Sequence, residues 1–488
     1  MWTDIGGFPE VDRLPVGDRL YCNRTLRLDQ VQIVGFDMDY TLAIYNQREM
    51  DRLGIEATVR NLIAWGYPRE LATMPYRADF GIRGLLVDAK RGNVLKIDRH
   101  RYVKKAYHGH TELDRDERLS EYESRQLRPG SGRYRWVDTL YELSEVAVYA
   151  AAVDQLEAMG EEVDYEQLLT DVRRGVDTAH RNGDIFAALR SDLGRYLRRD
   201  NQLGPTLHRL RSAGKRLFVL TNSPWQATNT IMSYLLDDAL PEYPSWQGYF
   251  DIVVTAAGKP GFFTGDRPFL AVDADGGTEP AGGLERGGVY AEGNITELDR
   301  FLDSAGDGVL YVGDHIYGDV LRAKLAPGWR TVMIIQELPH ELEGLATHRE
   351  QFRQIDELEE LRRTHHDQVR FWRSADADHF LGSGQLQLDF AGTHDGATPE
   401  QWKRAQIDHH LAAIRSVEEQ VEQLEAEVDT AFHPYWGSLF RAGTEVSSFG
   451  SQVLQYACLY TDRVSNLGSY SPVHYFRSPR QRLPHDVV

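Results

Sequence analysis

The chain has 488 residues, of which 41% are hydrophobic and 26% are charged, and this composition excludes an intrinsically disordered protein. Its formal net charge of −19 argues against binding to a nucleic acid polymer, because that affinity depends on clustered Lys and Arg. Two cysteines without a C-x-x-C pair exclude a disulfide framework and a thiolate zinc site. We find neither a signal peptide pattern nor an apolar run of membrane length, so we expect a cytoplasmic protein that does not bind membranes.

The first predicted element is an apolar strand at 31–36, which ends on two carboxylates, Asp37 and Asp39. Side chains two residues apart on a strand point to the same side, so one aspartate can attack phosphorus while the other handles the proton. A capped turn after a core strand would place the same residues there. The strand ends that follow along the chain favour the catalytic interpretation.

Residues 83–88 and 93–98 flank a turn that contains glycine, and this pattern predicts a β-hairpin beside the first strand.

From about residue 136 to residue 199 the apolar spacing changes to three and four, which predicts an all-helical insertion. On its second helix Arg173, Asp177 and His180 share one face. This face is either a solvated salt bridge with a spare histidine or a polar recognition surface over an active site.

Four further strands are predicted at 216–221, 250–255, 308–313 and 330–335. Polar residues follow three of them: Thr221 with Asn222 and Ser223, then Lys259, then Asp314 with Asp319. Since the strands alternate with helical segments, we expect a doubly wound, Rossmann-like α/β fold with a parallel sheet. The glycine- and acid-rich run 273–293 is expected to be a flexible or hairpin excursion.

These strand ends supply the groups that metal-assisted phosphoryl transfer requires. A phosphate monoester repels an attacking carboxylate, so a hard cation is needed, and Asp37 and Asp314 offer the oxygen ligands that Mg²⁺ prefers. Lys259 would neutralise charge on the transferring oxygens, and Thr221 would donate a hydrogen bond to one of them.

The motifs Asp37-Met-Asp39-Tyr-Thr41, Thr221-Asn-Ser223, Lys259-Pro260 and Gly313-Asp-His-Ile-Tyr-Gly-Asp319 resemble those of haloacid dehalogenase superfamily phosphatases. More narrowly, they resemble the cytosolic purine 5′-nucleotidases, and the similarity extends to residues 83–88, 437–441 and 451–456.

This resemblance implies a haloacid dehalogenase-like core with an inserted helical cap and C-terminal helices. We predict core segments at 1–115 and 206–345, a substrate-recognising cap at 116–205, and a C-terminal helical region at 346–488.

The resemblance also implies roles for individual residues. Asp37 would be the nucleophile and Asp39 the acid and then the base. Mg²⁺ would be held by Asp37, Asp314 and the main-chain oxygen of Asp39, with Asp319 in support. The implied substrate ligands are Arg173, Asp177, His180, Glu142, Asn222 and Ser223, with Tyr141 stacking on the base.

Several positions depart from the pattern of the resembled family. Glu142 replaces an asparagine and Phe186 a lysine of the base pocket, while Arg181 replaces a second stacking aromatic residue. Around the family's regulatory nucleotide site, Gln455 and Leu325 replace an arginine and a lysine, although Arg330 remains. We therefore expect altered base selection and weak activation by ATP.

In the C-terminal region Thr398, Pro399 and Gln401 predict the start of a long helix that ends at Pro434. Its apolar residues alternate spacings of four and three, and they predict either an antiparallel hairpin within the chain or a contact between subunits of a homo-oligomer. The pairs His365-His366 and His409-His410 are interpreted as surface residues.

Three functions are compatible with the sequence. The first is a Mg²⁺-dependent hydrolase of purine nucleoside 5′-monophosphates of the GMP and IMP type, able to pass the phosphoryl group to a second nucleoside. The second is a phosphatase of another phosphometabolite, and the third is a non-catalytic nucleotide-binding protein. The intact set of Asp37, Asp39 and Lys259 argues against the third.

Overall fold

The computed structural model describes residues 14–122, 126–304, 306–374 and 398–479. The chain divides into two compact units, one formed by Met1–Leu342 with Glu445–Val488 and the other by Glu343–Thr444. We had predicted a single C-terminal helical region at 346–488. The structure differs, because residues 445–479 fold with the first unit.

The first unit is built on a ten-stranded sheet in the order β1-β20-β17-β16-β3-β11-β12-β15-β13-β14. The strands from β20 to β15 are parallel, as predicted for a doubly wound fold, and β1, β13 and β14 are antiparallel to their neighbours. Their bounds are β1 Tyr21–Cys22, β3 Ile33–Phe36, β11 Arg216–Leu220, β12 Ile252–Thr255, β13 Phe269–Val272, β14 Thr278–Pro280, β15 Gly288–Glu292, β16 Val309–Gly313, β17 Arg330–Ile334 and β20 Leu459–Thr461.

The five strands predicted from apolar runs are all present, but β1, β13, β15 and β20 were missed. These strands are short or lie in stretches that sequence patterns assign to loops and helices. The 273–293 excursion contains the turn and second strand of the β13–β14 hairpin, followed by strand β15, which extends the parallel sheet beside β12.

Burial explains why the sequences of the central strands are continuously apolar. Every residue of β3 and β16 is buried, because parallel sheets are covered on both faces. Gly35 in β3 packs against Phe218 of β11, where a Cβ atom would collide with the aromatic ring. The associated helices are α7 Leu203–Ser212, α8 Trp225–Leu236, α9 Ile295–Leu302, α10 Arg322–Leu325 and α16 Ser448–Tyr456.

A second, antiparallel sheet in the order β8-β7-β6-β5-β9 forms part of the cap. It comprises β5 Leu85–Asp88, β6 Asn93–Ile97, β7 Val103–His108, β8 Thr111–Glu112 and β9 Tyr134–Val137. The predicted β5–β6 hairpin is confirmed, but its predicted position beside the first strand is wrong. A turn pattern fixes the pairing within a hairpin and does not fix the sheet that the hairpin joins.

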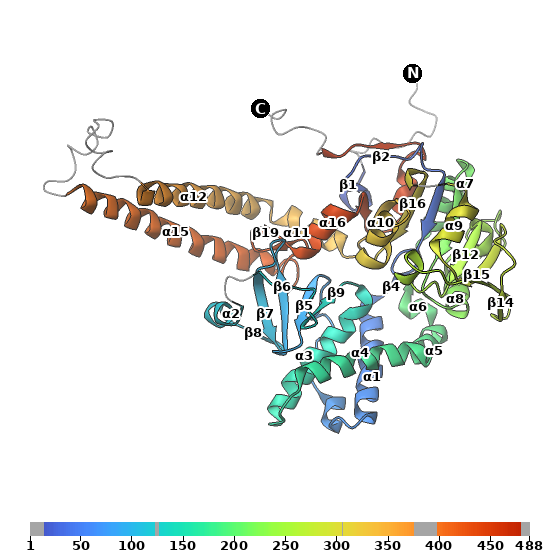
Figure 1. Cartoon of the computed structure of the whole chain (residues 1–488), viewed down its shortest axis with the longest axis horizontal. Coiled ribbons are helices and arrows are strands. Elements are labelled where there is room, and N and C mark those ends of the chain that lie inside the picture. Colours follow the sequence, from blue (N-terminus) through green and yellow to red (C-terminus); the bar gives the residue numbers. More distant parts are fainter. Residues whose placement is uncertain (1–13, 123–125, 305, 375–397, 480–488) are drawn as a thin grey trace, which may run out of the picture. The chain divides into compact units, whose positions relative to one another are not determined.

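The cap helices are α1 Gln47–Ala64, α2 Arg115–Tyr122, α3 Leu143–Ala158, α4 Tyr165–Arg181, α5 Asp184–Ser191 and α6 Leu193–Tyr196. Helices α1, α3 and α4 pack against one another (Figure 1). The chain leaves the core through β4 Ile44–Tyr45 and returns through β10 Leu197–Arg198, and these two strands pair with each other. The inserted segment thus begins earlier than residue 116.

The second unit contains a helical hairpin of α12 Arg349–Ser374 and α15 Pro399–Asp429, which lie side by side (Figure 1). Ile355 of α12 packs with Val417, Val421 and Val428 of α15, so the antiparallel interpretation of the apolar stripe is confirmed. The predicted capping box at Thr398 and Gln401 is present. Helix α15 ends at Asp429, before the predicted end at Pro434.

The remaining elements include two short strands, β18 Arg441–Ala442 and β19 Glu445–Val446, and helix α11 Leu338–Thr347. Strands β2 Leu26–Arg27 and β21 Tyr475–Phe476 pair antiparallel in the first unit. Among the described residues, no helix combines the length and the apolar character needed to cross a bilayer.

Candidate active site

The carboxyl ends of four neighbouring strands bring the predicted catalytic residues to one edge of the main sheet. The strands lie in the order β16-β3-β11-β12 and are all parallel. Asp314 follows β16, Asp37 follows β3, Thr221 follows β11, and Lys259 lies in the loop after β12. In open α/β sheets ligands bind at this edge, since the loops there are free to carry chemistry.

Lys259 is the central cation of this edge. Its Nζ atom lies 2.9 Å from Asp37 Oδ1 and 2.7 Å from Asp319 Oδ1. It also donates a hydrogen bond of 3.0 Å to the hydroxyl of Tyr311. The Tyr311 hydroxyl donates in turn to the carbonyl oxygen of Leu220, at 3.0 Å. The lysine is thereby held from several sides at a fixed position.

Three buried carboxylates form the only group of three or more potential metal ligands among the described residues. Asp37, Asp314 and Asp319 each offer an oxygen within 4.8 Å of the others. Because all three are carboxylates, the set fits a hard cation such as Mg²⁺ and does not favour a soft metal. Lys259 can neutralise one of the three charges, so a further cation or a proton can balance the others.

The titration behaviour of these residues reflects this excess of buried acid. Burial raises the pKa of Asp314 to about 8, with a further contribution from the charge of Asp319. Burial also raises the pKa of Asp37 well above its ordinary value, although Lys259 opposes the shift. For Lys259 burial acts to lower the pKa, but Asp319 and Asp37 outweigh it and the pKa is raised.

Asp39 is held by two hydroxyl groups. Tyr45 donates a hydrogen bond of 2.6 Å to Oδ1, and Ser223 donates one of 2.5 Å to Oδ2. Burial raises the pKa of Asp39, while both hydrogen bonds act to lower it. Tyr40 follows with a φ angle of 57°, a conformation that residues other than glycine rarely adopt. The carboxylate is thus fixed in direction and lies beside the turn.

The residues after β11 are also fixed by hydrogen bonds. Asn222 donates through its amide nitrogen to the carbonyl oxygen of Lys259, at 3.0 Å, and its amide oxygen accepts from the Lys259 N–H, at 2.6 Å. Its side chain therefore holds the loop that carries the lysine. Thr221 is fully buried, and its hydroxyl oxygen accepts a hydrogen bond of 3.1 Å from the Ser223 N–H.

The cap residues predicted to meet the substrate gather around Arg173. Its guanidinium lies 3.3 Å from Glu142 and 3.8 Å from Glu145. Glu142 also accepts a hydrogen bond of 2.7 Å from the main-chain N–H of Asp138. Glu145 is 5% exposed, and burial raises its pKa to about 7. Sequence analysis did not select Glu145, because it occupies a position on an otherwise apolar helix.

Tyr141 and His180 are in direct contact, with ring centroids 4.3 Å apart. Burial lowers the pKa of His180 to about 4, so the imidazole is neutral near pH 7. Burial is the main cause of the raised pKa of Tyr141, and the negative charge of Asp177 raises it further. The structure therefore brings together the predicted cap residues Tyr141, Glu142, Arg173, Asp177 and His180.

His315 connects the cap cluster to the acid edge. It follows Asp314, and burial lowers its pKa. The carboxylates of Asp319, from the core, and Glu142, from the cap, both act on it in the opposite direction. His315 is thus within electrostatic reach of carboxylates from both groups of predicted residues.

Comparison with known proteins identifies the family of this chain. The sequence model of the 5′ nucleotidase family matches residues 20–488. The chain belongs to this family. It is accordingly a phosphoric monoester hydrolase, and its fold is the α/β fold with a parallel sheet described above.

Individual relatives of the family are distant in sequence. A 5′-nucleotidase domain-containing protein of Dictyostelium discoideum is 28% identical over 99% of this chain and 77% of its own length. The human 5′-nucleotidase domain-containing protein 2 is also 28% identical, over 98% of this chain and 87% of its own length.

Solved structures give similar matches at lower identity. CbbY from Rhodobacter sphaeroides in complex with phosphate is 15% identical over 62% of this chain and 86% of its own, with a TM-score of 0.25. L-2-haloacid dehalogenase from Xanthobacter autotrophicus is 14% identical over 63% of this chain and 78% of its own, with a TM-score of 0.21.

At the position of the resembled regulatory site, two of the three residues of this 5′ nucleotidase family member, Leu325 and Gln455, carry no charge. Arg330 forms an ion pair with Asp307, with an N–O distance of 2.8 Å. Leu325 is 68% exposed and carries no charge. The main-chain oxygen of Gln455 accepts a hydrogen bond of 3.2 Å from Lys324.

Three residues that contact the predicted site were missed in the sequence. Tyr311 lies inside β16 and Tyr45 inside β4, where an aromatic residue is expected in the core. Arg83 precedes an apolar hairpin strand and is 1% exposed. No local pattern marks these side chains, because their partners come from distant segments.

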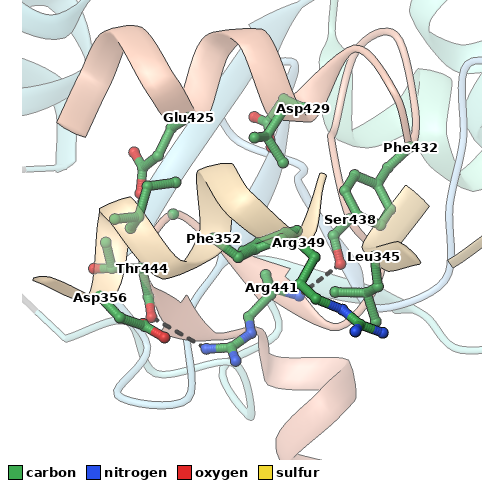
Figure 2. A pocket seen from close by; sticks show the side chains of 13 residues that line it. Leu345, Arg349, Phe352, Asp356, Glu425, Asp429, Phe432, Ser438, Arg441 and Thr444 are labelled. Atoms are coloured by element: carbon green, nitrogen blue, oxygen red, sulfur yellow. Dashed lines mark hydrogen bonds between the residues drawn. The ribbon is translucent and has the colours of Figure 1, made fainter. Parts of the chain in front are cut away.

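The second unit contains a cavity of about 210 Å³, which includes none of the predicted site residues (Figure 2). Phe352 and Phe432 contribute to an apolar lining, and the charged residues Arg349, Arg441 and Asp356 also line it. These arginines and Asp356 are exposed, and the cavity does not assemble a nucleophile with a base.

Proposed function

We propose that this member of the 5′ nucleotidase family is a Mg²⁺-dependent hydrolase of purine nucleoside 5′-monophosphates, of the GMP and IMP type. The observation that carries the proposal is the cluster of Asp37, Asp39, Lys259 and Asp314 at one edge of the parallel sheet. A nucleotide-binding protein without catalysis would not need a second, hydrogen-bonded aspartate beside the first.

In the proposed reaction an oxygen of Asp37 attacks phosphorus, and the bond between phosphorus and the 5′-oxygen of the nucleoside breaks. Asp39 gives its proton to the leaving oxygen, a role that its raised pKa and its fixed direction suit. Asp39 then takes a proton from water, which attacks the aspartyl-phosphate and releases phosphate. A hydroxyl group of a second nucleoside in place of water would give phosphotransfer.

The remaining residues of this edge stabilise the charge of the phosphoryl group and hold the catalytic groups in position. Lys259 stabilises the anionic oxygens of the transferring group, while Asn222 fixes its loop and Thr221 is placed to donate to one oxygen. Asp37, Asp314, Asp319 and the main-chain oxygen of Asp39 would hold Mg²⁺. The bound cation would reduce the repulsion between the phosphate ester and the carboxylates.

On the base side, Tyr141 supplies an aromatic face and Asp177 and Glu142 supply acceptors. An acceptor-rich pocket favours a ring edge that presents donors, and guanine presents N1–H and an exocyclic amine where hypoxanthine presents only the first. Phe186 cannot donate to a 6-oxo group. We therefore propose that GMP is hydrolysed at least as well as IMP, and that AMP is penalised less than the family pattern implies.

A second candidate function, a phosphatase of another phosphometabolite, is favoured by the ion pair between Glu142 and Arg173. This pair occupies groups that could otherwise bind a base. We further propose that the enzyme acts in the cytoplasm as a homo-oligomer.

The proposal is tested by phosphate release from a panel of esters, with Mg²⁺ and with EDTA. The panel contains GMP, IMP, AMP, CMP, UMP and two sugar phosphates, and Asp37→Asn protein is the control for contaminating phosphatases. We expect purine monophosphates to give the highest kcat/KM and EDTA to abolish release. A sugar phosphate as the best substrate would support the second candidate instead.

A further inference from the structure

Arg83 is a buried arginine whose guanidinium reaches the loop that carries Asp314. Its side chain is 0% exposed. Nε and Nη2 donate to the two carboxylate oxygens of Glu337, at 2.8 and 2.6 Å. Nη1 donates to the main-chain carbonyl oxygen of Asp314, at 2.9 Å. The guanidinium thus joins Glu337, which follows β17, to the residue that follows β16.

An aromatic ring also contacts this guanidinium and helps to fix its orientation. The ring of Phe449 lies below it, with its centroid 5.0 Å from Cζ. The next residue, Gly84, has a φ angle of 82°, and a Cβ atom there would lie 2.6 Å from Cβ of Phe449. Glycine at this position therefore allows the backbone to approach Phe449 closely, and Arg83 is buried as a result.

The Asp314 loop is consequently held at two points. Arg83 fixes the carbonyl oxygen of Asp314, and the N–H of His315 donates to Asp319 Oδ2, at 3.3 Å. Both Asp314 and Asp319 belong to the group of three carboxylates within 4.8 Å of one another. A shift of this loop would change the separation of those oxygens.

We propose that Arg83 and Glu337 are positioning residues that set the affinity of the three-carboxylate group for its divalent cation. Arg83 restrains the Asp314 main chain, and Glu337 orients Arg83. This inference rests on the proposed function, because it takes Asp37, Asp314 and Asp319 as the cation ligands. Neither residue touches the cation or the substrate. Partners of this kind, bonded to a ligand residue, alter metal affinity by about 10-fold to 100-fold when they are mutated.

A purely structural role for Arg83 is the alternative, and the other end of β5 offers a matched control. Asp88, the last residue of that strand, has a side chain that is 0% exposed and binds both Nε and Nη2 of Arg133, at 2.8 and 2.5 Å. This pair is also bidentate, and it joins β5 to the residue that precedes β9. It contacts none of the three carboxylates, so its loss should affect folding stability alone.

The experiment measures Mn²⁺ binding to the full-length protein without substrate, by titration followed with electron paramagnetic resonance of the free ion. Thermal unfolding is recorded for every variant. Glu337→Gln retains shape but replaces one acceptor oxygen with a donor, and Arg83→Lys retains charge but cannot bind two oxygens side by side. Asp88→Asn is the matched control, and Asp314→Asn defines binding at the proposed centre.

We expect the Mn²⁺ dissociation constant to rise at least about 10-fold in Glu337→Gln and Arg83→Lys, and to stay within about twofold in Asp88→Asn. The inference is overturned if a folded Glu337→Gln or Arg83→Lys protein binds Mn²⁺ within about twofold of the unmutated protein. Failure of Asp314→Asn to weaken Mn²⁺ binding would instead overturn the proposed metal centre, and this inference with it.

Discussion

The acid edge of the main sheet and the cap cluster around Arg173 both gather carboxylates, but they balance the charge differently. At the sheet edge, Asp37 and Asp319 share Lys259, and Asp314 belongs to the same group, where the charges of Arg83 and Lys259 act on it. In the cap, Arg173 lies between Glu142 and Glu145. Under the proposed function the first arrangement binds an added metal ion, whereas the second already holds its own cation.

This difference indicates how each region recognises the substrate. The sheet edge is fixed by main-chain geometry and by buried hydrogen bonds, so it can stabilise a demanding transition state. The cap cluster depends on side chains that bind one another, and a base must compete with those contacts. Mutations at the sheet edge should therefore abolish chemistry, while mutations in the cap should change substrate preference.

The largest effect is expected for Asp37→Asn. The substitution preserves size but removes the attacking anion, so kcat should fall by at least about 1,000-fold. Steady-state phosphate release from GMP measures this loss, with circular dichroism to establish folding. A folded variant that keeps more than about a tenth of the activity would exclude Asp37 as the nucleophile.

Asp39→Asn should lower activity on nucleotides by about 100-fold to 10,000-fold, because the 5′-oxygen leaves poorly without a proton. The nitrophenolate of p-nitrophenyl phosphate needs little protonation, so phosphorylation by that ester should be comparatively spared. Single-turnover rates for both esters measure the contrast. Equal losses would remove the acid role from Asp39.

Asp177→Asn should reduce kcat/KM for GMP more than for IMP, by a difference of about 1 to 3 kcal/mol, because an amide replaces one acceptor oxygen. Glu142→Gln should also reduce kcat/KM for GMP more than for IMP, because it removes the second proposed acceptor, and it should weaken the contacts with Arg173 and the Asp138 N–H as well. Competition assays with the two nucleotides measure this ratio. An unchanged ratio in Asp177→Asn would place Asp177 away from the base.

His180 should make the cap sensitive to mild acid. Its pKa is lowered from 6.5 to about 4 in the folded protein, so between these values the unfolded chain binds the proton and the folded chain does not. The contribution of His180 to the free energy of unfolding therefore decreases as the pH falls from about 6.5 to about 4. From pH 7 to pH 5 the unmutated protein should lose about 1 to 2 kcal/mol of unfolding free energy relative to His180→Gln. Urea denaturation at both pH values measures the difference, and a constant difference would contradict the burial of a neutral His180.

The smallest effect is expected for ATP as an activator. Arg330 is paired with Asp307, and Leu325 and Gln455 bring no charge, so ATP should change the rate less than about twofold, because each missing charge-assisted hydrogen bond removes about 1.5 to 3 kcal/mol. Rates of GMP hydrolysis at saturating free Mg²⁺ with added ATP measure this. Strong stimulation by micromolar ATP would show that other residues form an effector site.

The two regions also differ in how far the sequence predicted them. Asp37, Thr221, Lys259 and Asp314 follow apolar strands, and parallel pairing alone brings such strand ends together. The alignment of Arg173, Asp177 and His180 on α4 followed from helical spacing. Their partners Tyr141 and Glu142 came from the family resemblance, and Glu145 on α3 was missed. Contacts between elements far apart in the chain, such as that of Tyr45 with Asp39, depend on tertiary packing that no local pattern encodes.

The same limit explains the errors in the fold. The turn at residues 89–92 predicted the β5–β6 hairpin but could not show that it joins the cap sheet. Strand β20 has only three residues and lies far from β17 in the sequence. No local sequence pattern therefore predicted that it pairs with β17 in the parallel part of the sheet. The resemblance to a known family supplied the cap as a unit, but not its first boundary.

The central claim is that Asp37 carries the phosphoryl group during turnover, and acid quenching of the enzyme during GMP hydrolysis tests it most directly. Rapidly quenched protein is digested and its peptides are analysed by mass spectrometry, in the presence of Mg²⁺. We predict a peptide that contains Asp37 and carries one phosphoryl group, absent from Asp37→Asn and more abundant in Asp39→Asn treated with p-nitrophenyl phosphate. Turnover of GMP with no phosphorylated Asp37 in any quenched sample, or with the phosphoryl group on another residue, would contradict the mechanism.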